Sequence, residues 1–137
     1  MNTAQQQSSL GALARAGTAL AWLTGVIYLI IGTGMAPDDL DSPPQAVMLV
    51  AGLAYIVGGW LIRRLNRRLV RAGAVANALV MVVYMVLLLA GRSDLEIYAA
   101  VSKLAQIGLE IVLIALLYGL TRTAADVVST PASQQAR

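Results

Sequence analysis

Long apolar stretches separated by short polar segments run through most of the chain. Each is close to the roughly 20 residues that an α-helix needs to cross a membrane at about 1.5 Å of rise per residue. The apolar stretches occupy residues 16–35, 45–62, 72–90 and 98–120. This pattern predicts an all-α protein whose four transmembrane helices form an up-down-up-down bundle.

The two ends of the chain have a different composition. Residues 1–14 and 123–137 are rich in Gln, Ser, Thr and Ala, which bury too little apolar surface to support packed structure. We therefore expect mobile tails at 1–14 and 123–137 around a single four-span membrane domain at 15–122. Because the first apolar stretch is long for the hydrophobic part of a secretory signal, we interpret it as a retained span.

The charged residues outside the apolar stretches predict an orientation. The segments 36–44 and 91–96 are acidic and contain one basic residue, Arg92, whereas 63–71 holds a cluster of arginines. The cluster consists of Arg63, Arg64, Arg67, Arg68 and Arg71. Because Lys and Arg concentrate in cytoplasmic loops, we expect both termini on the cytoplasmic side of a bacterial inner or plasma membrane. Such a cluster also attracts anionic lipid, so it does not indicate nucleic-acid binding.

The composition removes most familiar enzyme mechanisms. Hydrophobic residues make up 58% of the chain and charged residues 12%, and there is neither Cys nor His. Disulfides, thiolate chemistry, histidine-bearing metal sites and Ser/His or Cys/His nucleophile pairs are therefore excluded. Asp38, Asp39 and Asp41 lie in a short proline-containing loop where carboxylates are ordinarily solvated, so we expect no metal ion and no cofactor.

The two halves of the chain resemble each other in part. When residues 15–17 (Arg-Ala-Gly) are aligned with residues 71–73 (Arg-Ala-Gly), Tyr28 falls on Tyr84, but the second and fourth apolar stretches match less well. One interpretation is a duplicated helical hairpin whose copies are related by an axis along the membrane normal. The other is chance matching among few residue types.

A stripe of polar residues interrupts the last apolar stretch. Lys103, Gln106 and Glu110 are spaced by three and four residues, which places them on one face of a helix. Glu110 lies near the middle of the span, where an ionisable side chain usually faces the bundle interior. Lys103 lies about 10 Å away along the axis and is expected to snorkel outward, which leaves Gln106 to share a hydrogen bond with Glu110. Without a close cation, burial favours a neutral carboxyl that can exchange a proton.

Depth along the spans indicates which residues accompany this stripe. Counted inward from the span ends, Tyr55 lies near the level of Glu110, Tyr28 and Tyr84 lie in the outer half, and Asn77 lies in the inner half. Tyrosines in an aliphatic bundle form amphipathic walls for an apolar ligand with one polar end. The predicted ligand-binding residues are Glu110, Gln106, Lys103, Tyr55, Tyr28, Tyr84 and Asn77.

A structural role is the main alternative for these residues. Interhelical hydrogen bonds from Gln, Asn and a neutral Glu hold membrane helices together, at about 0.6 kcal/mol each. Small residues at four-residue spacing, such as Gly17, Ala21 and Gly25, favour close approach of helices, within the bundle or between copies in a homodimer.

Three functions are compatible with the sequence. The first is a membrane protein that binds or moves a small apolar or cationic ligand, in a proton-linked manner through Glu110. The second, ranked almost level, is a non-catalytic accessory or assembly subunit of a larger membrane complex. The third, ranked lower, is a membrane-embedded isomerase or cyclase of a lipid-like substrate with Glu110 as general acid. No residue is assigned a catalytic role, and the balance is against an enzyme.

Overall fold

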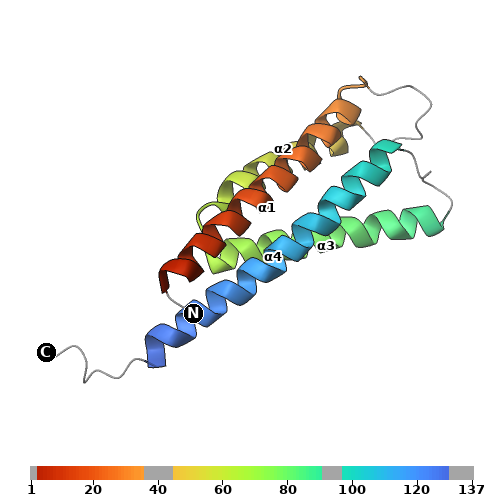
Figure 1. Ribbon diagram of the computed structural model, residues 1–137. Coiled ribbons are helices and arrows are strands. Elements are labelled where there is room, and N and C mark those ends of the chain that lie inside the picture. The colour runs from red at the N-terminus through yellow and green to blue at the C-terminus, as the bar shows by residue number, and fades with distance from the viewer. Residues whose placement is uncertain (1–2, 36–44, 91–96, 130–137) are drawn as a thin grey trace, which may run out of the picture.

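The computed structural model describes residues 3–35, 45–90 and 97–129, and this part of the chain is all-helical. The helices are α1 (Thr3–Gly32), α2 (Gln45–Ile62), α3 (Arg67–Leu89) and α4 (Ile97–Ser129) (Figure 1). All 4 are long and apolar enough to cross a membrane. The all-α class and the spans predicted from the apolar pattern are therefore confirmed for the described residues. The acidic segments, with Asp38, Asp39, Asp41 and Arg92, lie outside them.

Helix α2 has the limits predicted from the sequence, whereas the other helices begin earlier than predicted and α4 also ends later. α1 already begins at Thr3, within the segment expected to be a tail, and α4 continues to Ser129. Leu10 of α1 is buried and packs against Gly119 of α4, so the extension of α1 buries apolar surface. α3 begins at Arg67, inside the arginine cluster. Ala, Gln and Arg are good helix formers, and backbone hydrogen bonding continues past the ends of an apolar stretch.

A short turn joins α2 to α3. Leu65 has a positive φ of 49°, and Asn66 caps α3 because its side chain accepts a hydrogen bond from the backbone N of Arg68 at 2.9 Å. The guanidinium of Arg64 lies 4.4 Å from the centre of the Trp60 ring. The arginine cluster therefore surrounds a well-capped turn.

Small residues bring α1 close to α2. A Cβ atom added at Gly25 would lie 2.9 Å from the carbonyl oxygen of Gly52, and one added at Gly52 would lie 2.9 Å from that of Gly25. Across the same interface, Thr18 Oγ1 donates a hydrogen bond to the Gly59 carbonyl oxygen at 2.9 Å. The two backbones approach closely because neither glycine carries a side chain, so the small residues of α1 serve packing within this chain.

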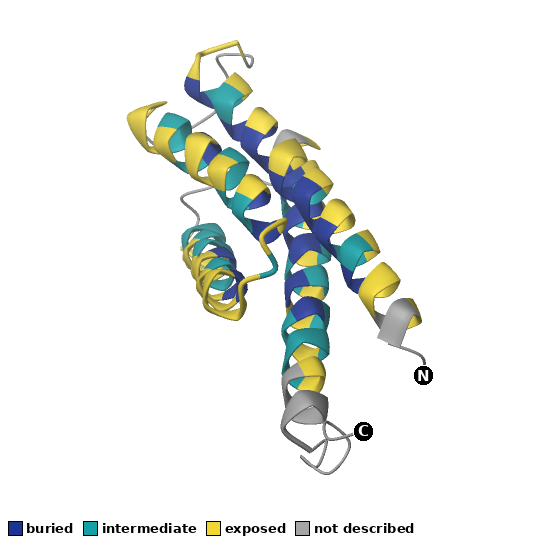
Figure 2. Ribbon diagram, turned by 90° about the vertical axis from the view of Figure 1, so that its left-hand side faces the viewer, coloured by how far each residue is buried: buried dark blue, intermediate teal, exposed yellow. Residues whose placement is uncertain are grey.

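The helices do not contact one another equally. α1 packs on both α2 and α4, and α4 also packs on α3, whereas α2 and α3 touch only sparsely. Figure 2 shows α3 set apart from α1 and α2 with a largely exposed surface, and α3 buries the smallest share of its span. Its exposed large apolar side chains are Leu69, Val75, Leu79, Val82, Val83, Met85, Val86 and Leu89. In a bilayer, these side chains face lipid or another protein.

The apolar core adjoins the buried polar side chains, and Tyr55 packs directly against it. The core comprises Leu10, Ala14, Ala21, Ile62, Val70, Ala74, Leu109, Leu113 and Leu116. These residues come from the first two thirds of α1, the end of α2, the first half of α3 and the middle of α4. Most of the buried polar side chains described next lie on the side of this core where α1 ends and α4 begins.

Candidate functional site

Polar and aromatic side chains from all four helices meet in the space between the helices. We call this group the polar cluster and define it as Tyr28 of α1, Tyr55 of α2, Asn77 and Tyr84 of α3, and Lys103, Gln106 and Glu110 of α4. Its members are joined by hydrogen bonds and by contacts between an ammonium group and aromatic rings. All the residues predicted for the ligand site are thus brought together, and their role in binding a ligand stays a prediction.

Gln106 is the central member of the polar cluster. Its side chain is fully buried, with 0% exposure. Nε2 donates hydrogen bonds to the hydroxyls of Tyr28 and Tyr55, both at 2.8 Å. Oε1 accepts one from Lys103 Nζ at 2.8 Å. Because these partners belong to α1, α2 and α4, the amide of Gln106 fixes three helices relative to one another.

Asn77 holds the carboxyl group of Glu110. Its Nδ2 donates hydrogen bonds to Glu110 Oε2 at 2.9 Å and to the backbone carbonyl of Gln106 at 3.0 Å. Its Oδ1 accepts one from the hydroxyl of Tyr55 at 2.9 Å. The sequence predicts Gln106 as the partner of Glu110, but the side chain of Gln106 is occupied by the tyrosines and Lys103. Asn77, which is 3% exposed, takes that role from the neighbouring helix.

The hydrogen bonds form a continuous chain between two ionisable groups. Lys103 donates to Gln106, Gln106 to Tyr55, Tyr55 to Asn77, and Asn77 to Glu110. Every donor in this chain points from the ammonium end toward the carboxyl end. Aligned hydrogen bonds polarise one another, most strongly where the local dielectric constant is low. The ammonium group of Lys103 is therefore linked to the carboxyl group of Glu110 through two amides and a hydroxyl.

Lys103 turns into the structure instead of snorkelling outward. It is partly buried, and its Nζ donates hydrogen bonds to the Tyr28 hydroxyl at 3.1 Å and to Gln106 Oε1 at 2.8 Å. The same nitrogen lies 4.2 Å from the centre of the Tyr84 ring and 5.8 Å from that of Tyr28. The aromatic faces and oxygen acceptors replace the water that snorkelling would have provided.

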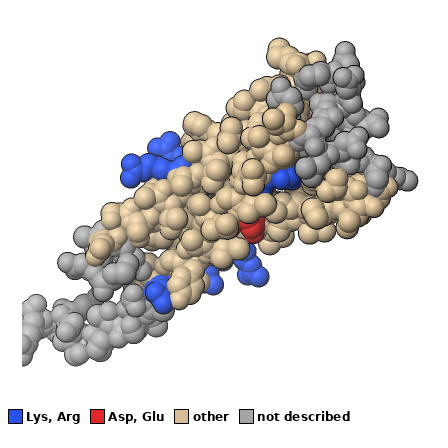
Figure 3. Space-filling view, turned by 45° about the vertical axis from the view of Figure 1, so that its right-hand side comes forward, with Lys and Arg blue, Asp and Glu red and all other residues tan. Residues whose placement is uncertain are grey.

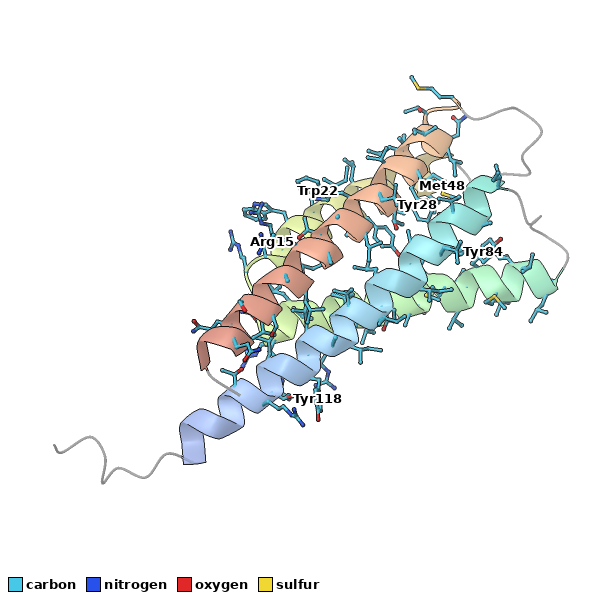
Figure 4. All side chains as sticks on the ribbon, in the orientation of Figure 1. Arg15, Trp22, Tyr28, Met48, Tyr84 and Tyr118 are labelled. Carbon is cyan, nitrogen blue, oxygen red and sulfur yellow. The ribbon has the colours of Figure 1, made fainter. Side chains whose placement is uncertain are left out.

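The tyrosines enclose the ammonium group from two helices. Figure 4 shows Tyr28 between α1 and α4, and Tyr84 between α4 and α3. Tyr28 also packs edge-to-face on Tyr55, with ring centroids 5.6 Å apart and an interplanar angle of 85°. The hydroxyl of Tyr84 is buried and has no hydrogen-bond partner among the described residues. A phenol placed in this way can still bond to a ligand.

Two further residues near the polar cluster, Met81 and Thr24, differ in whether they contact it. Met81 was not predicted, yet its Sδ lies 3.9 Å from Asn77 Nδ2, and the four-residue spacing on one helix is the signal that could have revealed it. Thr24 of α1 donates a hydrogen bond from its Oγ1 to the carbonyl oxygen of Leu20 on its own helix. Thr24 is fully buried and does not join the polar cluster.

The described surface is weakly charged around the middle of the spans. On the face shown in Figure 3, basic atoms lie in several separate groups at the left, along the lower edge and right of the centre, and the acidic atoms lie near the middle. Among the described residues there is no group of His, Cys, Asp and Glu side chains that could hold a metal ion. What the polar cluster offers is oxygen acceptors, aromatic faces, one ammonium group and one carboxyl group.

Comparison with protein families, with characterised proteins and with solved structures finds no match to this chain. The structure therefore defines a class only in physical terms: an all-α chain with 4 helices able to cross a membrane and a polar cluster between them. Any argument about function depends on the geometry of that cluster.

Proposed function

We propose that this chain is a small integral membrane protein whose polar cluster binds or moves a small apolar or cationic ligand, in a manner linked to a proton on Glu110. In this proposal the helices run up-down-up-down, with both termini on the cytoplasmic side because the arginine cluster faces inward. The observation that carries the proposal is the chain of hydrogen bonds from Lys103 to Glu110.

The magnitudes favour a functional site over structural glue. An interhelical hydrogen bond in a membrane contributes about 0.6 kcal/mol, whereas an ionisable residue at a helix centre costs about 2.5 to 3.5 kcal/mol. The bond from Asn77 to Glu110 falls well short of offsetting that cost. A neutral Gln in place of Glu110 would hold the helices equally well. The presence of a carboxyl group at position 110 is explained if this group exchanges a proton or binds a charged ligand.

A duplicated hairpin belongs to the same proposal. Tyr28 and Tyr84 align when the two halves of the sequence are superposed, and both contact the ammonium group of Lys103. A duplication supplies two tyrosines at equal depth on α1 and α3. The polar residues of α4 then have a matched aromatic residue on each side.

The proposal predicts that binding of a lipophilic cation depends on Glu110 and on pH. We expect tetraphenylphosphonium to bind the wild type in lipid nanodiscs and to bind less tightly as the pH falls, because the cation and the proton compete for one carboxylate. Glu110→Gln, which keeps an acceptor for Asn77, should weaken binding by about tenfold or more, equivalent to about 1.4 kcal/mol, and abolish the pH dependence. Scintillation proximity with the radiolabelled cation measures both effects.

The matched control is the other glutamate of the chain, Glu96, which lies between the apolar stretches. Glu96→Gln makes the same chemical change and should leave affinity and pH profile as in the wild type. Equal binding and equal pH dependence in the wild type and Glu110→Gln would overturn the proposal.

A second function is favoured by the exposed surface of α3. Under this alternative the chain is an accessory or assembly subunit, and the apolar side chains of α3 dock on another membrane protein. Val82→Trp should then release a stoichiometric partner that co-purifies with the wild type in mild detergent. Leu53→Trp is the control, because Leu53 of α2 is 56% exposed and Val82 is 57% exposed. A homogeneous monomer or homodimer from native membranes contradicts this alternative.

A further inference from the structure

The ammonium group of Lys103 occupies a site built from electron-rich groups. We call this site the ammonium cage and define it by Tyr28, Tyr84 and Gln106. The cage supplies the Tyr28 hydroxyl at 3.1 Å, Gln106 Oε1 at 2.8 Å and the face of the Tyr84 ring at 4.2 Å. Two aromatic rings and two oxygen acceptors around one nitrogen are the groups that recognise an organic cation.

The Lys103 side chain that occupies the ammonium cage has the chemical structure of a simple alkylammonium ligand. The lysine side chain is an n-butylammonium group tethered at one end, so its position shows what the cage accepts. Gln106 Oε1 takes one of the three donors of the ammonium and Tyr28 takes another. A free alkylammonium of similar length would present the same groups in the same order.

The geometry points to the ammonium cage as a binding site for a small primary alkylammonium ligand, with Lys103 as its built-in competitor. The inference rests on the proposed function, because it names the ligand class of the same polar cluster. When the ligand enters, the ammonium of Lys103 leaves the cage and snorkels along its four-carbon stem to the nearby end of α4.

Displacement is required because the cage holds one cation at a time. Two unit charges 4 Å apart repel by about 4 kcal/mol at an effective dielectric constant of 20. Lys103 is only partly buried and lies two turns from the start of α4 at Ile97, so it has a route outward. Exchange of one ammonium for another leaves the charge of the cluster unchanged.

The hydroxyl of Tyr84 supports the inference independently. It is buried, and among the described residues it has no hydrogen-bond partner, although the Tyr84 ring contacts Lys103. A buried polar atom without a partner is unfavourable unless a ligand or solvent satisfies it. A ligand that carries a second polar group beyond its ammonium would reach this oxygen.

An anionic ligand fits the cluster less well. It would pair with Lys103, but it would also meet the negative faces of Tyr28 and Tyr84, the Gln106 carbonyl oxygen and the Glu110 carboxyl. Apart from Lys103, the groups that face the cage favour a cation. The experiment must therefore distinguish binding of a cation from binding of a neutral or anionic molecule of the same size.

The first test uses n-butylammonium and removes the competitor. Lys103→Met keeps the length and apolar character of the stem without the charge. If the cage of the wild type is vacant in about one molecule in ten, n-butylammonium should bind Lys103→Met about tenfold more tightly. Isothermal titration into nanodiscs, with empty nanodiscs subtracted, measures the change. Leu104→Met is the matched control, since Leu104 is 70% exposed and should keep the wild-type affinity.

A second variant and two further probes make the test specific. Adding Tyr84→Leu to Lys103→Met should remove the gain in affinity for n-butylammonium, because one wall of the ammonium cage is lost. n-Butanol, which has the same chain without charge, should show no gain in Lys103→Met. If sodium butyrate binds the wild type and this binding is lost in Lys103→Met, the site recognises anions and the inference is overturned.

The third test needs no variant, so it decides the question even where Lys103→Met does not fold. Lys103 is the only lysine of the chain, and ¹³C,¹⁵N-lysine labelling therefore gives a single side-chain signal. The ε-methylene protons near the Tyr84 ring should be shifted upfield by the ring current. n-Butylammonium should move this signal to the position of an ordinary lysine, and n-butanol should not. An unmoved signal at saturating n-butylammonium overturns the inference.

Failure of this inference is distinguishable from failure of the proposed function. Tetraphenylphosphonium binding that depends on Glu110, together with an unmoved Lys103 signal, rejects the cage and keeps the proton-linked site. If tetraphenylphosphonium binding does not depend on Glu110 and the Lys103 signal does not move, both the proton-linked site and the ammonium cage are rejected. Movement of the Lys103 signal by n-butylammonium without any dependence on Glu110 keeps the cage and rejects the proton linkage.

Discussion

Replacing Gly25 with alanine should separate α1 from α2 and destabilise the protein. The added Cβ would lie 2.8 Å from Ile56 Cγ1 and 2.9 Å from the carbonyl oxygen of Gly52. A backbone oxygen cannot move aside as the end of a flexible side chain can, so the helices themselves must shift. We expect the free energy of unfolding to fall by about 1 to 3 kcal/mol, as in other overpacked interfaces. Unfolding in mixed micelles by titration with SDS measures this change.

The control for this substitution is a glycine with open space around it. A Cβ atom added at Gly58 would meet nothing within 4 Å, although Gly58 is also in a helix of the same interface. Gly58→Ala should be neutral or stabilising by up to about 1 kcal/mol, because alanine is the better helix former. Equal stability of Gly25→Ala and Gly58→Ala would show that the close glycine contact does not exist in solution.

The loss of α1–α2 contact should also disturb the polar cluster. Tyr28 lies one turn after Gly25 on α1, and its hydroxyl bonds both Gln106 and Lys103. A shift of α1 by a fraction of an ångström would lengthen these hydrogen bonds. In Gly25→Ala, the ring-current shift of the Lys103 ε-methylene signal should therefore decrease.

Replacing Gln106 with leucine should be the most damaging change within the polar cluster. Leucine has nearly the same volume, but it leaves the hydroxyls of Tyr28 and Tyr55 and the ammonium of Lys103 without their shared partner. Three hydrogen bonds at about 0.6 kcal/mol each set a lower limit near 2 kcal/mol. Buried groups left unsatisfied add to this loss. The same micelle titration measures it.

A double-mutant cycle separates the hydrogen bonds from general packing. If the bond from Gln106 to Tyr28 is the source of the effect, Tyr28→Phe should cost less in the Gln106→Leu background than in the wild type. Ile107→Leu is the control for a change on the lipid-facing side of α4, where Ile107 is 44% exposed. Additive effects of Gln106→Leu and Tyr28→Phe would contradict a direct hydrogen bond between these residues.

The sequence predicts the spans well because composition alone decides them. α2 is bounded by prolines before Gln45 and arginines after Ile62, and the structure has it at these limits. The beginning of α1 is different, because Leu10 is buried in a core that includes contact with Gly119, more than a hundred residues later. The polar composition around Leu10 gives no sign of this contact, which depends on a residue of α4.

Spacing and depth along the spans predict which residues belong to the polar cluster, but they do not predict which of these residues bond to each other. Lys103, Gln106 and Glu110 share a face because of helix periodicity, which is a property of the sequence. The bond from Asn77 to Glu110 depends on how α3 is rotated against α4, which no local pattern encodes. In the same way, the inward turn of Lys103 depends on Tyr84 standing opposite, on another helix.

The sparse contact between α2 and α3 has a consequence for how a ligand could arrive. The hydrogen bond from Tyr55 to Asn77 joins these helices at the level of the cluster, while Leu53 of α2 and Leu79 and Val82 of α3 are exposed apolar side chains. A molecule dissolved among the acyl chains has little protein to displace on this flank. Under the proposed function, we expect the bilayer itself to be the reservoir of an apolar or amphiphilic ligand, so that the ligand's concentration in lipid, not in water, sets the occupancy of the polar cluster.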